Sequence, residues 1–228
     1  MNGRRLSVVL CLAILAGATW IVHELSFGFE VWTFEGRRQR LIATGSLRAP
    51  QVPLRFAREP AQPLWRDDSP GRYGASPNRT AYLVDFVYTR CPGVCRALGN
   101  EYQQMQRALA SDPPEGDIRL VSISFDVAYD DPSRLAAQAA LLRADPQRWS
   151  FAVPGTARDA EALLGGLGVI AIPDGMGGFV HNGDIHLLDG QGRLRAVFAF
   201  DRWPEALEAA RQLTAPRAAT DVARQDRP

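Results

Sequence analysis

Short apolar runs alternate with helical patterns between residues 81 and 213, and this alternation limits the fold more than any other feature of the chain. Residues 81–88 (AYLVDFVY) form a mostly apolar run of strand length, rich in aromatic and β-branched side chains. Such a run is typical of a strand in the interior of a sheet. Residues 118–125 (IRLVSISF) repeat the pattern after a helical stretch. We therefore expect an α/β protein.

Capping and turn residues mark the later elements. Asp131 before Pro132, and Thr156 before a third helical stretch, are expected helix N-caps. Residues 189–192 (DGQG) separate two apolar runs and predict an antiparallel hairpin. The expected strands are 81–88, 118–125, 149–153, 184–188 and 194–200, and the expected helices are 92–109, 132–142, 157–167 and 203–213. A βαβ half followed by a ββα half is the thioredoxin-like order, and about 135 residues suffice for one core.

The N-terminal segment predicts export. Arg4 and Arg5 precede residues 6–22, which carry no charge and approach the length of about 17–25 residues that a spanning helix needs. We favour an uncleaved signal anchor with the arginines inside, although the basic residues 37–40 oppose that orientation. The alternative is a signal peptide cleaved near the small residues 16–18 (AGA). Either interpretation places the rest of the chain outside the cytoplasm.

The chain is expected to have four parts. Residues 1–27 form the anchor or signal, and residues 28–78 form a Pro/Arg-rich stalk and N-terminal extension. Residues 79–214 form the thioredoxin-like domain, and residues 215–228 a flexible tail. Within the stalk, two short apolar pieces at 30–34 and 52–56 are expected to form edge strands.

Composition excludes several kinds of chemistry. The chain has no lysine, so all 26 basic residues are arginine, and neither a P-loop lysine nor a Schiff-base lysine exists. A formal charge of +1 provides no basic field for nucleic acid. Three cysteines and three histidines cannot build a four-cysteine zinc ribbon or a ferredoxin-type iron–sulfur site.

The sequence TRCPGVC places Cys91 and Cys95 at the junction of the first strand and the first helix. Unpaired N–H groups at a helix N-terminus stabilise a thiolate, and we expect both sulfurs on one face of the first turn. Two such thiolates form a disulfide or bind one soft cation, Cu(I) above all, with zinc as the main competitor. In an exported protein the alternative is an inert structural disulfide.

Two histidines follow in the glycine-rich stretch before the hairpin. His181 would complete a three-coordinate site of two thiolates and one imidazole nitrogen, although a histidine bonded to the loop backbone is the more ordinary interpretation. His186 lies five residues further along the expected strand, so it should point to the opposite face. We therefore expect His186 to be structural.

The motifs around these residues resemble those of one family. Residues 84–95 (VDFVYTRCPGVC) resemble the F-x-Y-T-x-C-P-x-x-C segment of the SCO/SenC proteins, thioredoxin-like copper chaperones for cytochrome c oxidase assembly. Residues 121–126, ending in S-x-D, and 145–149 (DPQRW) are similar to the next two family motifs. His181 with residues 185–192 is similar to the fourth, H-x-x-x-I-x-L-x-D-x-x-G. The acidic turn D-P-x-x-D lacks its proline here, at residues 126–130.

The resemblance implies a Cu(I) or Cu(II) site formed by Cys91, Cys95 and His181. It implies that the protein delivers copper to the CuA centre in subunit II of cytochrome c oxidase, or keeps the cysteines of that centre reduced. Another periplasmic copper protein is the alternative partner. Together with the N-terminal segment, this predicts a single-pass protein of the bacterial inner membrane, held through residues 6–22, with its soluble domain in the periplasm.

Three functions remain open at this point. A metallochaperone would pass copper on by ligand exchange and catalyse no reaction. In a thiol oxidoreductase, Cys91 would attack the disulfide of a partner and Cys95 would resolve the mixed disulfide. The third possibility is an exported interaction module with a structural disulfide. The C-x-x-x-C spacing favours metal, because oxidoreductases of this fold usually use C-x-x-C.

Overall fold

A computed structural model describes residues 3–26, 28, 33–57, 64, 79–91 and 93–216. The chain divides into two compact units, Met1–Thr44 and Gly45–Pro228. Each unit is described by itself.

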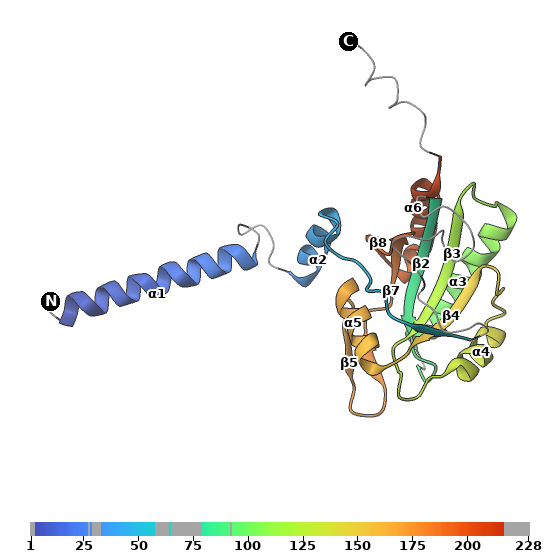
Figure 1. Cartoon of the computed structure of the whole chain (residues 1–228), viewed down its shortest axis with the longest axis horizontal. Helices are drawn as coiled ribbons and strands as arrows, with labels where there is room; N and C mark the ends of the chain where they lie inside the picture. The colour runs from blue at the N-terminus through green and yellow to red at the C-terminus, as the bar shows by residue number, and fades with distance from the viewer. Residues whose placement is uncertain are drawn as a thin grey trace, which may run out of the picture. The chain divides into compact units, whose positions relative to one another are not determined.

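The first unit contains two helices, α1 (Gly3–Leu25) and α2 (Phe34–Ala43), drawn in blue in Figure 1. Within α1, residues Ser7–Leu25 are long and apolar enough to cross a membrane, a test that a signal sequence also passes. The prediction of an edge strand at 30–34 is wrong for Phe34, which begins α2. Residues 30–32 of that prediction lie outside the described part. The Thr33 hydroxyl accepts a hydrogen bond from Gly36 N–H at 3.0 Å and so caps this helix.

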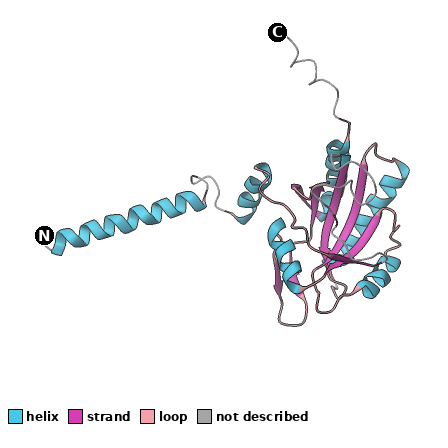
Figure 2. Cartoon of the chain, viewed as in Figure 1, coloured by secondary structure: helices cyan, strands magenta, loops and turns pink. Residues whose placement is uncertain are grey.

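The second unit is built on a mixed six-stranded sheet (Figure 2). In spatial order its strands are β1 (Leu54–Phe56), β4 (Trp149–Pro154), β3 (Asp117–Ser124), β2 (Thr80–Val87), β7 (Asp184–Asp189) and β8 (Leu194–Ala199). The strands β2, β3 and β4 pair parallel with one another. The pairs β1–β4, β2–β7 and β7–β8 are antiparallel. The edge strand expected at 52–56 is therefore present, three residues long.

The helices begin and end close to where the capping residues predict. They are α3 (Val94–Ser111), α4 (Pro132–Leu141), α5 (Ala157–Leu167) and α6 (Trp203–Thr214), the last preceded by a 3₁₀ turn, η2 (Phe200–Arg202). Asp131 and Thr156 accept hydrogen bonds from the N–H groups of Arg134 and Asp159, at 2.9 and 3.1 Å. Of the expected flexible tail, only residues 215 and 216 lie within the described part.

The core explains why β2 reads as a continuous apolar run. All eight of its residues are buried. One hydrophobic cluster contains alternate residues of this strand, Ala81 and Leu83, together with side chains of α3, α4 and α6. Buried on both faces, β2 is a rigid base for the loop that follows its carboxyl end.

A second, two-stranded sheet lies outside these expectations. It consists of β5 (Ala171–Pro173) and β6 (Phe179–His181), paired antiparallel, and we call residues 171–181 the β5–β6 arm. Asp174 accepts hydrogen bonds from the N–H groups of Met176 and Gly178 at 2.7 and 2.9 Å, which closes the turn between the strands. The arm carries His181, and it therefore decides where that imidazole lies.

Candidate metal centre

The two cysteines lie where β2 leads into α3. Cys91 belongs to the turn after β2, and its N–H donates to the carbonyl of Tyr88 at 3.1 Å. Cys95 lies in the first turn of α3, and its N–H donates to Cys91 Sγ at 3.4 Å. The expectation that both sulfurs lie on one face of the helix is corrected here, because Gly93 is the N-cap and Cys91 precedes the helix. Cys91 Sγ nevertheless accepts a hydrogen bond from a backbone N–H group at the helix N-terminus.

His181 reaches the cysteine pair from the β5–β6 arm. Its Nε2 lies 3.9 Å from Cys95 Sγ, and its Nδ1 lies 3.2 Å from the backbone carbonyl of Asn182. A proton on Nδ1, donated to that carbonyl, leaves the lone pair of Nε2 for a ligand. The Sγ atoms of Cys91 and Cys95 and the nearer ring nitrogen all lie within 4.8 Å of one another. The structure therefore brings the three predicted ligands together.

His186 lies away from this group, as expected, but for a different reason. It is fully buried on β7, and its ring meets Phe86 edge-on with centroids 5.4 Å apart. The expectation assumed one strand through both histidines, whereas His181 and His186 lie on strands of separate sheets. The structural role expected of His186 agrees with its burial.

Aromatic side chains that the sequence reasoning overlooked surround His181. The ring centroids of Phe125 and Tyr88 lie 5.2 and 5.9 Å from that of His181. Phe179, on the same strand as His181, packs edge-on against both of these rings. The imidazole therefore packs against the rings of Phe125 and Tyr88. Tyr88 could have been noticed as the tyrosine of the motif around Cys91.

Acidic side chains hold the turn that carries Cys91. Asp130 accepts hydrogen bonds from the backbone N–H of Thr89 at 2.9 Å, from the Thr89 hydroxyl, and from the Ser124 hydroxyl at 2.5 Å. Asp126 forms an ion pair with Arg90 at 2.6 Å. Both carboxylates come from residues 126–130, so the missing proline does not prevent this turn from contacting the cysteine loop.

The electrostatics differentiate the three ligands. Burial alone would raise the pKa of Cys91, but hydrogen bonds from the thiol and N–H of Cys95, from Gly93 and from the Tyr88 hydroxyl lower that pKa below its usual value. Burial, and then the hydrogen bond with Cys91, raise the pKa of Cys95. Burial lowers the pKa of His181, so its imidazole is neutral at pH 7. Cys91 is thus the better nucleophile, and His181 is in the form that binds metals.

A buried carboxyl group lies close to the cysteines. Asp85 of β2 is 1% exposed, and burial raises its pKa to about 7. Asp85 and Cys95 both line one small cavity between β2, α3 and α4. The sequence reasoning did not single out this residue, although an aspartate inside a strand expected in the sheet interior was the available signal.

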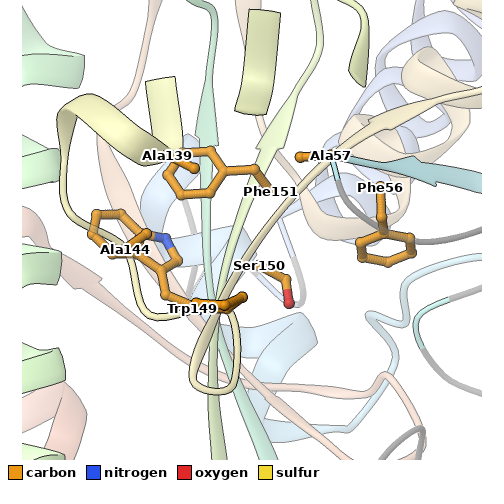
Figure 3. A pocket seen from close by; sticks show the side chains of 8 residues that line it. Phe56, Ala57, Ala139, Ala144, Trp149, Ser150 and Phe151 are labelled. Carbon is orange, nitrogen blue, oxygen red and sulfur yellow. The ribbon is translucent and has the colours of Figure 1, made fainter. Parts of the chain in front are cut away.

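Another small pocket, near β1 and α4, offers no comparable chemistry (Figure 3). Its lining residues are Phe56, Ala57, Ala139, Ala144, Pro146, Trp149, Ser150 and Phe151. None of these eight side chains is a metal ligand of the cysteine, histidine or carboxylate type. The cysteine–histidine group is therefore the candidate site.

Comparison with known proteins identifies sequences similar to this chain. A sequence model described as SCO1/SenC matches residues 74–214. The chain is also similar to the SCO1 protein homolog of Bacillus subtilis (strain 168), with 24% identity over 115 residues. That match spans 50% of this chain and 58% of the relative's own length.

Solved structures share the fold. The structure of BsSco, described as a member of the Sco family of cytochrome c oxidase assembly proteins with a disulfide switch, is 15% identical. It covers 75% of this chain and 95% of its own, with a TM-score of 0.60. The structure of Bradyrhizobium japonicum ScoI with copper bound is 23% identical. The match covers 74% of this chain and 99% of ScoI, with a TM-score of 0.55. These likenesses confirm the expected thioredoxin-like fold.

Proposed function

The chain belongs to the SCO1/SenC family, and from this premise we propose that it binds copper through Cys91, Cys95 and His181 and delivers it to the CuA centre of cytochrome c oxidase subunit II. The observation that carries the proposal is the meeting of two sulfurs and one imidazole nitrogen within 4.8 Å of one another, from three separate elements. Soft thiolates select Cu(I), and an imidazole suits either oxidation state.

The donor set favours copper over zinc. Structural zinc sites almost always have four protein ligands in a tetrahedron. The group found among the described residues has three donors, which agrees with three-coordinate Cu(I). The neutral His181 and the lowered pKa of Cys91 both reduce the cost of displacing protons when the metal binds, whereas the raised pKa of Cys95 increases it.

The exposure of the ligands is suited to transfer. Cys91 and His181 are half-buried, whereas Cys95 is 7% exposed. An acceptor ligand can therefore approach the metal from the side of Cys91 and His181, while Cys95 holds it until exchange is complete. The description of BsSco as an oxidase assembly protein, and the copper in ScoI, support this role by relationship.

The proposed setting is the periplasmic face of a bacterial inner membrane. The apolar helix α1 supports either a retained anchor or an export signal. An anchor would keep the copper domain near a membrane-bound oxidase, so we retain the anchored form as the proposal.

A second candidate function is thiol–disulfide exchange with the same oxidase or another periplasmic partner. Both cysteines are free thiols, and the pKa of Cys91 is lowered as an attacking thiol requires. Cys91 would displace one sulfur of the partner's disulfide, and Cys95 would then displace the second. The partner would leave as a dithiol, with Cys91 and Cys95 oxidised to a disulfide.

A titration with Cu(I) against a competing chelator tests the ligand set. We expect His181→Ala to weaken binding at least tenfold, or about 1.4 kcal/mol, and Cys91→Ser to abolish competitive binding. His23→Ala, which removes a histidine of α1, is the control and should bind like the wild type. If His181→Ala binds copper as tightly as the wild type, the three-ligand site is wrong.

A further inference from the structure

The hydroxyl of Tyr88 connects the cysteine loop with the arm that carries His181. Tyr88 directly follows β2, and its backbone carbonyl accepts the N–H of Cys91 at 3.1 Å. Its hydroxyl accepts the backbone N–H of Phe179 at 3.2 Å and donates to the carbonyl of the same residue at 3.3 Å. One side chain thus satisfies both backbone polar groups of a residue on β6.

The position of Phe179 on β6 links its hydrogen bonds with Tyr88 to the orientation of His181. In a strand, residues two apart point to the same face, so Phe179 and His181 share a face while Val180 points the other way. The exposures agree, because Val180 is 66% exposed and its partner in register, Ile172, is 58% exposed. Fixing the backbone of Phe179 therefore fixes the face that presents the imidazole.

The connection matters because the arm is a sheet of its own, held to the rest of the unit by these bonds and by the packing of Phe179 against Tyr88 and Phe125. Its two strands have three residues each and pair with one another, apart from the six-stranded sheet. A Cβ atom added to Gly178 would lie 3.2 Å from the Tyr88 hydroxyl and 2.6 Å from Asp174 Oδ2. The backbone thus approaches the hydroxyl as closely as a glycine allows.

We propose that Tyr88 is a positioning residue for the third metal ligand: its hydroxyl, bound to the backbone N–H and carbonyl of Phe179, holds β6 so that His181 Nε2 faces Cys95 Sγ. This inference rests on the proposed function, since it assigns a role within the same copper site. Ligands must be held within about half an ångström of their working geometry. The buried phenol supplies that constraint from the strand that also leads to Cys91.

The substitution Tyr88→Phe tests this role because it keeps the ring and removes only the hydroxyl. The two backbone groups of Phe179 then lack their partner, and β6 is free to shift or to recruit water. We expect the affinity for Cu(I) to fall about fivefold, the usual effect of one or two lost hydrogen bonds. The expected spectroscopic signature is a weakened nitrogen ligand, seen in X-ray absorption as a partial change from three-coordinate to two-sulfur Cu(I).

Tyr82→Phe is the matched control. Tyr82 lies on β2, is fully buried, and donates its hydroxyl to a backbone carbonyl, that of Leu64, at 3.3 Å. The Tyr82→Phe variant therefore loses the same chemical group from the strand that precedes Tyr88, at a hydroxyl that bonds to Leu64. Thermal unfolding of the full chain in detergent should show comparable losses of stability for both variants, whereas Cu(I) affinity should change less than twofold in Tyr82→Phe.

A double variant separates the two paths by which Tyr88 could act. If the hydroxyl acts through His181, Tyr88→Phe changes the affinity less than twofold in a His181→Ala background. The Tyr88 hydroxyl also interacts with the Cys91 thiol. An equal loss in both backgrounds would overturn the proposal, because the phenol would then act through Cys91. Gly178→Ala, whose Cβ would crowd both this hydroxyl and Asp174 Oδ2, should also weaken the nitrogen ligand and serves if Tyr88→Phe unfolds.

The remaining outcomes are equally decisive. If His181→Ala weakens copper binding while Tyr88→Phe retains wild-type affinity and three ligands, the positioning role is wrong and the proposed function stands. If His181→Ala itself binds like the wild type, the ligand set and the positioning role both fail.

Discussion

At the level of single residues, Asp85 has the most testable effect on stability. Its carboxyl is 1% exposed on β2, and burial raises its pKa to about 7 from an ordinary value of 3.8. Between pH 3.8 and about pH 7, Asp85 therefore keeps its proton in the folded chain and releases it in the unfolded chain. The carboxyl therefore favours the unfolded state increasingly as the pH rises from about 4 to 7. The contribution of Asp85 to the free energy of unfolding is therefore most favourable in acid and is lost as the pH rises toward neutral.

We predict that Asp85→Asn reduces this pH dependence. Applied to the raised pKa, the linkage relation gives a loss of about 2–3 kcal/mol in the free energy of unfolding of the wild type between pH 5 and pH 8. The amide cannot ionise, so the variant should lack this contribution. Urea unfolding at the two pH values measures the difference. Asp112→Asn, at a carboxyl whose side chain is 80% exposed, is the control; equal slopes for Asp85→Asn and the wild type would refute the prediction.

Among the secondary-structure elements, α4 offers a local test of the sequence rules. Asp131 has extended backbone angles, and its carboxylate accepts the N–H of Arg134 at 2.9 Å, as an N-cap should. Both side chains of its ion pair with Arg134 are exposed, so this ion pair contributes little to the free energy of unfolding. The cap bond is therefore the main contribution of this side chain.

We predict that Asp131→Ala lowers the free energy of unfolding by about 1 kcal/mol. The change should leave Cu(I) affinity unaltered, because α4 supplies no ligand of the site. Chemical denaturation and copper titration of the same sample measure both quantities. Glu161→Ala, an exposed acidic position inside α5, should change stability by less than about 0.5 kcal/mol. If the two variants are equally destabilised, Asp131 is not an effective cap.

For the whole molecule, the two compact units predict separable properties. The unit Gly45–Pro228 contains the hydrophobic core and all three proposed ligands. The unit Met1–Thr44 contains the apolar helix, whose side chains are largely exposed. Membrane attachment is therefore expected to depend on the first unit and copper binding on the second.

We predict that residues 45–228 alone fold and bind Cu(I) within about twofold of the full chain, while the full chain remains in the membrane fraction after an alkaline wash. Titration of both forms and fractionation of cells measure this. A reporter enzyme that is active only after export, fused after residue 30, tests the orientation. Activity confined to a cytoplasmic reporter at that position would contradict the export interpretation.

Much of the fold followed from local patterns in the chain. The periods of strands and helices, the caps at Asp131 and Thr156, and the DGQG hairpin turn each depend on residues close in sequence, so they could be read without a structure. The cysteine pair and His181 were identified from spacing, scarcity and family motifs. The beginning of α3 could not be placed as well, because Gly93 rather than Cys91 caps that helix.

What the sequence alone determined is the α/β order of elements and the short set of candidate ligands. Tertiary structure alone decided that His181 lies on a separate arm, that Tyr88 binds that arm, and that Asp85 is buried beside Cys95. The physical reason is distance along the chain. Cys95 and His181 are 86 residues apart, and Tyr88 and Phe179 are 91 apart. Their geometry therefore depends on how the sheet and the arm pack, which no local pattern records.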